Sequence, residues 1–150
     1  MTAYLAYWKP REVDWDDPGS HVLRHAWSQQ YHKIGSGDRV YLITSHRGTL
    51  YLLGRIDVDA RVGRMEAASR LGLPPDELTG DHHIFAAPGA AMPITPIPCE
   101  DALRKVYTVA AGKAQQIKEP IHAQRFQTMR QISPGSATIL DDLLAGHAST

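Results

Sequence analysis

Cysteine and long apolar runs are what this sequence most lacks. Cys99 is the only cysteine in 150 residues, so no disulfide can form within the chain and no thiolate cluster can bind a metal ion. No apolar run is long enough to cross a membrane, and the N-terminal stretch MTAYLAYWKPREVDW carries a proline and acids where a secretion signal needs an apolar core. We therefore expect a cytoplasmic protein, with neither a metal nor another cofactor.

Net charge is absent as well, because 16 basic side chains balance 16 acidic ones. This balance argues against a protein that binds nucleic acid through bulk charge alone. The charges are unevenly spread, however, and residues 102–131 contain Glu119 as their only acid. The basic residues of that segment are Arg104, Lys105, Lys113, Lys118, Arg125 and Arg130. The segment is either an unevenly charged surface or a site that contacts phosphates.

Turn residues divide the chain into short segments of recognisable periodicity. Ser20 is a candidate N-cap, and Ser133 followed by Pro134 begins the clearest helix, which Gly146 should end. Apolar or alternating runs predict strands. We expect strands over residues 3–8, 39–46 and 49–60, helices over 21–32, 62–73 and about 133–146, and a loop over 112–120.

The order of these segments favours one α+β domain over residues 1–150. Strands follow one another through short connections, which predicts a mixed or antiparallel sheet rather than a doubly wound one. Gly54 interrupts an apolar strand and marks a bulge or bend, as in a small curved barrel decorated with helices. Gly48 stands in a short hairpin between residues 46 and 49, where a positive φ is needed.

The usual catalytic motifs are missing. Ser28, Ser45 and Cys99 are possible nucleophiles, but none lies in a nucleophile-elbow pattern. His82 and His83 are adjacent, so on a strand they face opposite sides and cannot readily bind one metal ion. These patterns favour a binding protein over an enzyme.

Aromatic residues are the better functional lead. All three tryptophans, Trp8, Trp15 and Trp27, fall within the first 27 residues. Aromatic walls bind planar ligands by stacking, and a base flipped out of a helix is read by such walls together with polar groups. Each tryptophan could instead be a core residue or a loop anchor, but their crowding near polar strand ends favours a site.

Four short motifs follow one another within residues 3–60, and their order is informative about the fold. The first strand ends at Trp8, a Gly37-Asp38 turn follows, the next strand ends in Thr44-Ser45-His46, and Gly54 opens the stretch GRIDV. This order resembles the EVE-type domain of the PUA-like superfamily, which is related to ASCH and YTH domains. Where that family carries Asn-x-x-Ala-Arg, this chain has Trp27-Ser28-Gln29-Gln30.

The resemblance implies a PUA-like pseudo-barrel that reads a modified nucleobase, more in DNA than in RNA, without catalysis of its own. Its base pocket would be formed by Tyr7, Trp8, Trp27, Ser28, Thr44, Ser45 and His46. Contacts to the nucleic-acid backbone or a base edge would come from Lys9, Arg47, Arg125, Gln127 and Arg130. The C-terminal half resembles segments of EVE-like modules joined to restriction nucleases, which implies a nuclease partner or fused domain in a modification-dependent restriction system.

Two other functions stay open. The first is an ASCH-like small hydrolase acting on a modified nucleoside, for which Lys9 or Glu12 would supply the catalytic group. The second is a small-molecule sensing module with a PUA-like fold. Binding of oligonucleotides with defined modified bases would separate the three functions.

Overall fold

The computed structural model describes residues 1–10 and 13–148. Three α-helices and four 3₁₀ segments connect eleven short strands in this part of the chain. The strands are β1 (Ala3–Tyr7), β2 (Val22–Leu23), β3 (His25–Trp27), β4 (Arg39–His46), β5 (Thr49–Val62), β6 (His83–Ala86), β7 (Met92–Pro93), β8 (Ile97–Pro98), β9 (Tyr107–Ala110), β10 (Lys113–Gln116) and β11 (Arg130–Ile132). The helical segments are η2 (Pro18–Ser20), η3 (Gln29–Lys33), α1 (Arg64–Leu71), η4 (Pro75–Glu77), α2 (Glu100–Leu103), η5 (Ala123–Phe126) and α3 (Pro134–Ala148).

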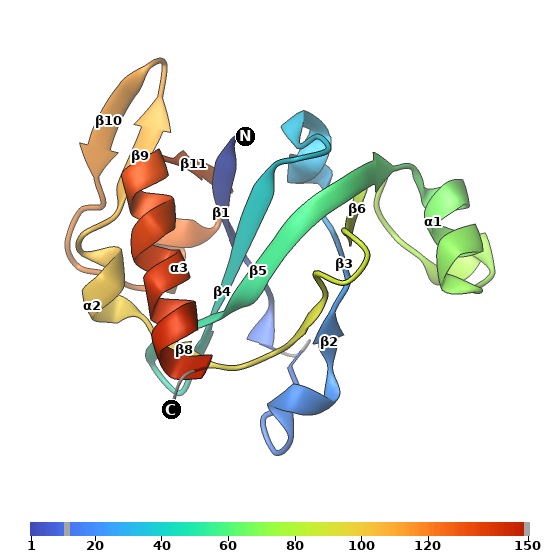
Figure 1. Ribbon diagram of the computed structural model, residues 1–150, viewed down its shortest axis with the longest axis horizontal. Helices are drawn as coiled ribbons and strands as arrows, with labels where there is room; N and C mark the ends of the chain where they lie inside the picture. Colours follow the sequence, from blue (N-terminus) through green and yellow to red (C-terminus); the bar gives the residue numbers. More distant parts are fainter. Residues whose placement is uncertain (11–12, 149–150) are drawn as a thin grey trace.

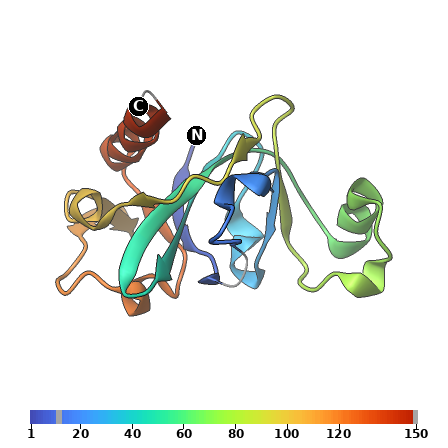
Figure 2. The same ribbon diagram turned by 90° about the horizontal axis from the view of Figure 1, so that it is seen from below.

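A curved mixed sheet organises the molecule (Figure 1). Its strand order is β10-β9-β11-β1-β4-β5-β6-β3, with β8 paired to β5. Only β1 and β4 run parallel among the described pairs, and the hairpin β4–β5 forms the longest pairing. The predicted α+β class with a mixed, curved sheet is confirmed. Figure 2 shows α3 and α1 at opposite ends of the molecule.

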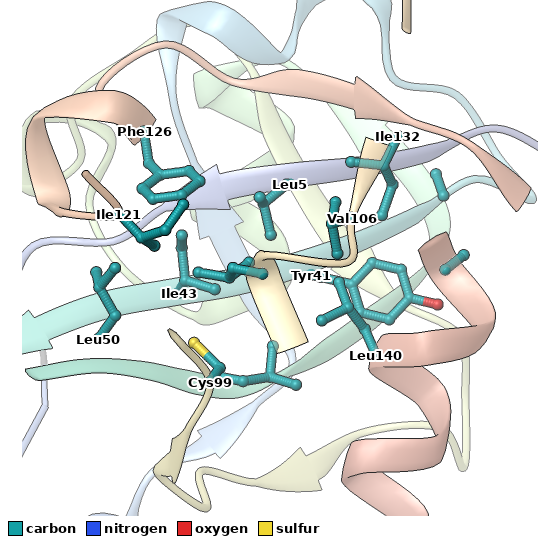
Figure 3. Packing of buried hydrophobic residues seen from close by; sticks show 14 residues of the cluster. Leu5, Tyr41, Ile43, Leu50, Cys99, Val106, Ile121, Phe126, Ile132 and Leu140 are labelled. Atoms are coloured by element: carbon teal, nitrogen blue, oxygen red, sulfur yellow. The ribbon is translucent and has the colours of Figure 1, made fainter. Parts of the chain in front are cut away.

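Alternation along β1, β4 and β5 gives the sheet two apolar faces. Leu5, Tyr41 and Leu52 point to the first face, and Tyr4, Val40 and Ile56 point to the second. On the first face, α3 adds Ala137 and Leu140 to the core, which Figure 3 shows from close by. The helix that the sequence predicted most clearly therefore closes one side of the sheet.

Charged and polar groups fasten α3 to that face. The Asp141 carboxylate accepts hydrogen bonds from the Tyr41 hydroxyl at 2.6 Å, from Arg55 Nη1 at 2.7 Å and from Arg39 Nη1 at 3.1 Å. Burial, together with the bond to Asp141, raises the pKa of Tyr41 above its usual value. Asp57 Oδ1 lies 3.1 Å from Nε of both arginines, an ionic contact without hydrogen-bond geometry. The four-residue network centred on Asp141 holds the helix in place.

Gly54 is a bulge, as predicted. Its φ is 155°, and the pairing of β4 with β5 shifts register between Leu42 and Ile43. A Cβ added at Gly54 would lie 2.6 Å from Cδ1 of Leu23, so a side chain there would push the buried Leu23 side chain aside. Gly48, with φ 80°, turns the β4–β5 hairpin as expected.

Three sequence-based expectations were wrong. Residues 21–32 do not form a helix: they form β2, β3 and most of η3, because Leu23 and Ala26 pack into the core on the second face of the sheet. Residues 113–116 form β10, a strand, instead of a loop. Finally, α3 continues past Gly146 to Ala148. No helix of the described residues is long and apolar enough to span a membrane.

Candidate functional site

A cavity of about 650 Å³ opens beside the free edge of β3. Its wall is built by the end of β1, by β2 and β3, by η3, and by the segment 127–129 that precedes β11. This volume is within the range of small-molecule and base pockets. Of the residues predicted for the site, the cavity brings together Tyr7, Trp8, Lys9, Trp27, Ser28 and Gln127.

Two tryptophans supply the aromatic walls. Trp8 follows β1, where its backbone N–H donates to Ile43 O at 2.8 Å, and its ring meets His21 edge-on with centroids 5.6 Å apart. Trp27 ends β3 and keeps 41% of its surface exposed, a large fraction for an indole. Its ring lies against Gly80, where an added Cβ would approach Trp27 Cε3 to 2.3 Å. The exposed indole is thus held in position from behind.

The side chain of Gln30 holds another part of the cavity wall in place. Gln30 Nε2 donates to Gln127 O at 3.1 Å, and Gln30 Oε1 accepts from the backbone N–H of Met129. Ser28 Oγ accepts from Gln30 N at 3.1 Å and so caps η3. These bonds tie η3 to a segment almost a hundred residues away in the sequence, which gives the cavity a defined rim.

The charge of the wall is one-sided. Lys9, His21, Arg24 and His25 line the cavity, whereas no carboxylate does so among the described residues. Arg24 and Trp27 are exposed, and Lys9 is exposed beside Trp8. A wall with cationic groups and no acid favours a ligand that carries negative charge or is rich in acceptor atoms.

The polar end of β4 does not line this cavity. Thr44 is fully buried, and its hydroxyl donates to Trp8 O at 2.6 Å. Ser45 points to the other face and shares a 2.7 Å hydrogen bond with the Tyr7 hydroxyl. His46 stacks on Trp15, with ring centroids 3.9 Å apart and planes 10° from parallel. Alternation along β4 sends neighbouring side chains to opposite faces, so Thr44, Ser45 and His46 cannot share one pocket with Trp8.

The predicted basic residues divide between two places. Arg125 and Arg130 line a second, smaller cavity of about 240 Å³ together with Lys118. Arg125 donates to Glu119 O at 3.1 Å, whereas Arg130 and Lys118 are exposed and have no ion-pair partner among the described residues. Arg47 lies exposed at the tip of the β4–β5 hairpin, with φ 50°, and lines neither cavity. Segment 125–130 thus contributes to both cavities.

Two histidines extend the site along β3 and β6. His25 Nε2 lies 2.8 Å from Nδ1 of His83, and His83 Nε2 lies 3.1 Å from Gly80 O. Burial, and secondarily the charge of His83, lowers the pKa of His25 to about 4. His82 faces the other way and contacts Arg61, so the adjacent histidines lie on opposite sides of the strand, and no three metal-ligating side chains cluster in the described residues.

Of the candidate catalytic groups, Cys99 lies in the core, whereas Lys9 and Ser28 line the large cavity. Cys99 is buried, and burial followed by the charge of Glu100 raises its pKa to about 12, so the thiol is not activated. Lys9 lines the large cavity, but Glu12 lies outside the described residues. The sequence reading missed His21, Arg24, His25, Gln30 and Met129. A correct assignment of residues 21–27 as strands would have placed His25 and Trp27 on one face.

The fold is shared with a protein of known structure. No known protein family and no curated protein matches the sequence. The structure is similar to the crystal structure of ASCH from Zymomonas mobilis, with a TM-score of 0.55 over 94% of each chain at 14% identity. The fold is PUA-like. The likeness supports the predicted fold, a curved mixed sheet decorated with helices, while the EVE type stays a prediction.

Proposed function

We propose that this protein binds nucleic acid and holds one modified base in the large cavity, in DNA rather than RNA. The observation that carries the proposal is the cavity wall, in which Trp8 and Trp27 stand beside Lys9 and Arg24, with no carboxylate among the described residues. Indole faces stack on any base, and the nearby cations suit the phosphate that accompanies it. We place the module in the cytoplasm, where the lone buried thiol of Cys99 stays reduced.

The second cavity supports a path for the phosphate backbone. Lys118 and Arg130 are exposed there without ion-pair partners among the described residues, and segment 125–130 joins this groove to the base cavity. A strand that places a base between Trp8 and Trp27 would then pass its phosphates over Lys118 and Arg130. A neutral protein gains affinity in this way from one stacked base and a few phosphates instead of a long basic face.

The module reads its ligand and leaves the chemistry to a partner. A nuclease, as a separate subunit or a fused domain of a modification-dependent restriction system, would act on the DNA that this module binds. Support for this division comes from Cys99, which is buried and not activated, and from Ser28, whose hydroxyl caps η3.

Binding assays with labelled oligonucleotides test the proposal. One set carries a single 5-methylcytosine, 5-hydroxymethylcytosine or N6-methyladenine in single- or double-stranded DNA, and a matched set carries the same modification in RNA. We expect at least one modified DNA to bind about 10-fold more tightly than its plain counterpart. Equal affinity for every modified and plain pair would overturn the proposal.

One observation favours a second function, that of a small hydrolase acting on a modified nucleoside. Lys9 lies in the cavity wall beside Trp8, where an amine could act on a bound nucleoside. Incubation of the protein with modified nucleosides, followed by chromatography of the products, distinguishes the two functions. Turnover that is lost in Lys9→Ala would support the hydrolase and contradict a module without catalysis.

A further inference from the structure

His25, which lines the cavity, and the buried His83 form a hydrogen-bonded chain with a fixed direction. His25 on β3 and His83 on β6 stand nearly parallel, with ring planes 9° apart and centroids separated by 5.1 Å. The chain runs from His25 Nε2 to His83 Nδ1 at 2.8 Å, and from His83 Nε2 to Gly80 O at 3.1 Å. His83 is completely buried, and no acidic side chain contacts its ring among the described residues.

The Gly80 carbonyl, at one end of these hydrogen bonds, determines which ring nitrogens carry protons. A carbonyl oxygen can only accept, so His83 Nε2 must carry the hydrogen that it donates to Gly80 O. A neutral imidazole has one N–H, which leaves Nδ1 of His83 as an acceptor. His25 must then donate through Nε2, and its remaining nitrogen, Nδ1, carries a lone pair.

That remaining nitrogen is free. Nδ1 of His25 has no hydrogen-bond partner in the described part of the chain and is not among its buried, unpaired polar atoms. His25 lines the large cavity, while its ring is backed by His83 and by Phe85, whose centroid lies 4.9 Å away. An accessible acceptor on a ring that His83 and Phe85 hold in place is available to a ligand in the cavity.

We propose that His25 determines the specificity of the cavity, with its Nδ1 acting as a fixed acceptor that selects ligands offering an N–H donor. The ligand class is a planar heterocycle with an amino or ring N–H group on the edge that meets His25. That the ligand is a base rests on the proposed function. The direction of the hydrogen bonds between His25, His83 and Gly80 is independent of it. A ligand that covers this acceptor without offering it a donor leaves it unpaired, which is costly, so such a ligand binds less tightly.

Protonation would reverse the preference. One proton added to the pair places a hydrogen on Nδ1 of His25, whichever ring carries the charge, and turns the acceptor into a donor. The charged or titratable neighbours are His83, Arg70 over the Phe85 ring at 5.2 Å, and the cavity residues Lys9, His21 and Arg24, none of which stabilises a cation. Burial and His83 lower the pKa of His25 to about 4, so the acceptor form holds at neutral pH.

Nuclear magnetic resonance of the free protein tests the chain without a ligand or a variant. Imidazole ¹⁵N shifts distinguish protonated from unprotonated ring nitrogens. At pH 7 we expect His25 to carry its proton on Nε2 and His83 to carry its proton on Nε2 as well. A proton on Nδ1 of His25 would overturn the proposal, whatever the protein binds.

Binding of adenosine, N6-methyladenosine and N6,N6-dimethyladenosine, with the corresponding cytidine series, tests the selection. In one series or both, we expect the dimethyl compound, which has no amino N–H, to bind about 10-fold more weakly than its parent. His25→Phe should remove this difference, whereas His21→Phe, which changes another cavity histidine, should keep it. Equal binding of parent and dimethyl compound, or a difference that survives in His25→Phe, would overturn the proposal. If no nucleoside binds, the same comparison is made with oligonucleotides that carry one parent or dimethylated base, where equal binding overturns the selection by His25. Loss of all preference for modified bases would overturn the proposed function, whereas the acceptor assigned to Nδ1 is tested by the ¹⁵N shifts alone.

Discussion

The face of the sheet that α3 covers and the face that carries the cavity differ in how their polar groups are satisfied. Under α3, the carboxylate of Asp141 takes three hydrogen bonds from Tyr41, Arg39 and Arg55. At the cavity, Trp27 remains exposed and Nδ1 of His25 has no partner among the described residues. Groups that are paired within the chain contribute to folding, whereas groups left free can contribute to binding. Variants on the two faces should therefore affect different measurements.

Leu140→Ala should have the largest effect, and it should affect stability. Leu140 is fully buried between α3 and the sheet, so its truncation leaves a cavity in the core on the face that α3 covers. We expect the free energy of unfolding to fall by about 2–5 kcal/mol, measured by urea denaturation. At a temperature where the variant is folded, its affinity for a modified oligonucleotide should match that of the wild type. A loss of affinity in the folded variant would show that the two faces are coupled.

Asp141→Asn tests the polar half of the same face. The substitution removes the negative charge that pairs with both Arg39 and Arg55. Because Asp141 is only half-buried, the loss of unfolding free energy should be limited to about 1–3 kcal/mol. Asp142→Asn is the matched control, since that neighbouring carboxylate is exposed. Equal stability of the two variants would mean that the Asp141 network does not hold α3.

Trp27→Ala should weaken binding and leave stability almost unchanged, the reverse of what we expect for Leu140→Ala. The exposed indole contributes a stacking wall, worth about 1–3 kcal/mol of binding, and little of the core. We expect the preference of about 10-fold for a modified oligonucleotide to be lost, while unfolding free energy changes by less than about 1 kcal/mol. Trp15→Ala is the control, because Trp15 stacks on His46 away from the cavity. A similar loss of preference in both variants would contradict the assigned cavity.

Acid should weaken folding through His25. Its pKa is about 4 in the folded protein, below the value of 6.5 for a free histidine, so between these values the unfolded chain binds the extra proton. Stability therefore falls as the pH is lowered from about 6.5 to about 4, by about 1 kcal/mol, since partial exposure of the ring reduces the full effect. Thermal unfolding of wild type and His25→Phe should diverge over this window. Parallel pH profiles would contradict a neutral, half-buried His25.

Arg130→Ala should give the smallest effect. Loss of one phosphate contact should weaken binding of modified and plain DNA alike and reduce the slope of log affinity against log salt by about 1. Arg64→Ala on α1 removes an exposed arginine at the far end of the molecule and should leave the slope unchanged. An unchanged slope in Arg130→Ala would place the phosphates elsewhere.

The sequence predicted the parts of the molecule in which local pattern and tertiary packing agree. Ser133 and Pro134 begin α3, and Gly54 forms the bulge, because caps and glycine geometry are local properties. Residues 21–27 failed because helical spacing of Leu23 and Ala26 is indistinguishable from two short strands facing a core. The placement of His25 against His83 depends on that pairing, so the predicted pocket contained Trp8 and Trp27 but not the histidines.

The pocket prediction failed at Thr44, Ser45 and His46 for a related reason. The three residues are contiguous in the sequence, but a strand turns each neighbour to the opposite face. His46 stacks on Trp15, outside the cavity. A strand end thus contributes at most alternate side chains to one site.

The three indole N–H signals report most directly on whether the large cavity is the binding site. Trp8 and Trp27 lie in the cavity wall, and Trp15 lies outside it, with its Nε1 donating to Pro10 O at 3.2 Å. During titration with the modified oligonucleotide that binds best, we predict saturable shifts of the Trp8 and Trp27 signals and no shift of the Trp15 signal. Binding that leaves the Trp8 and Trp27 signals unchanged would contradict the account.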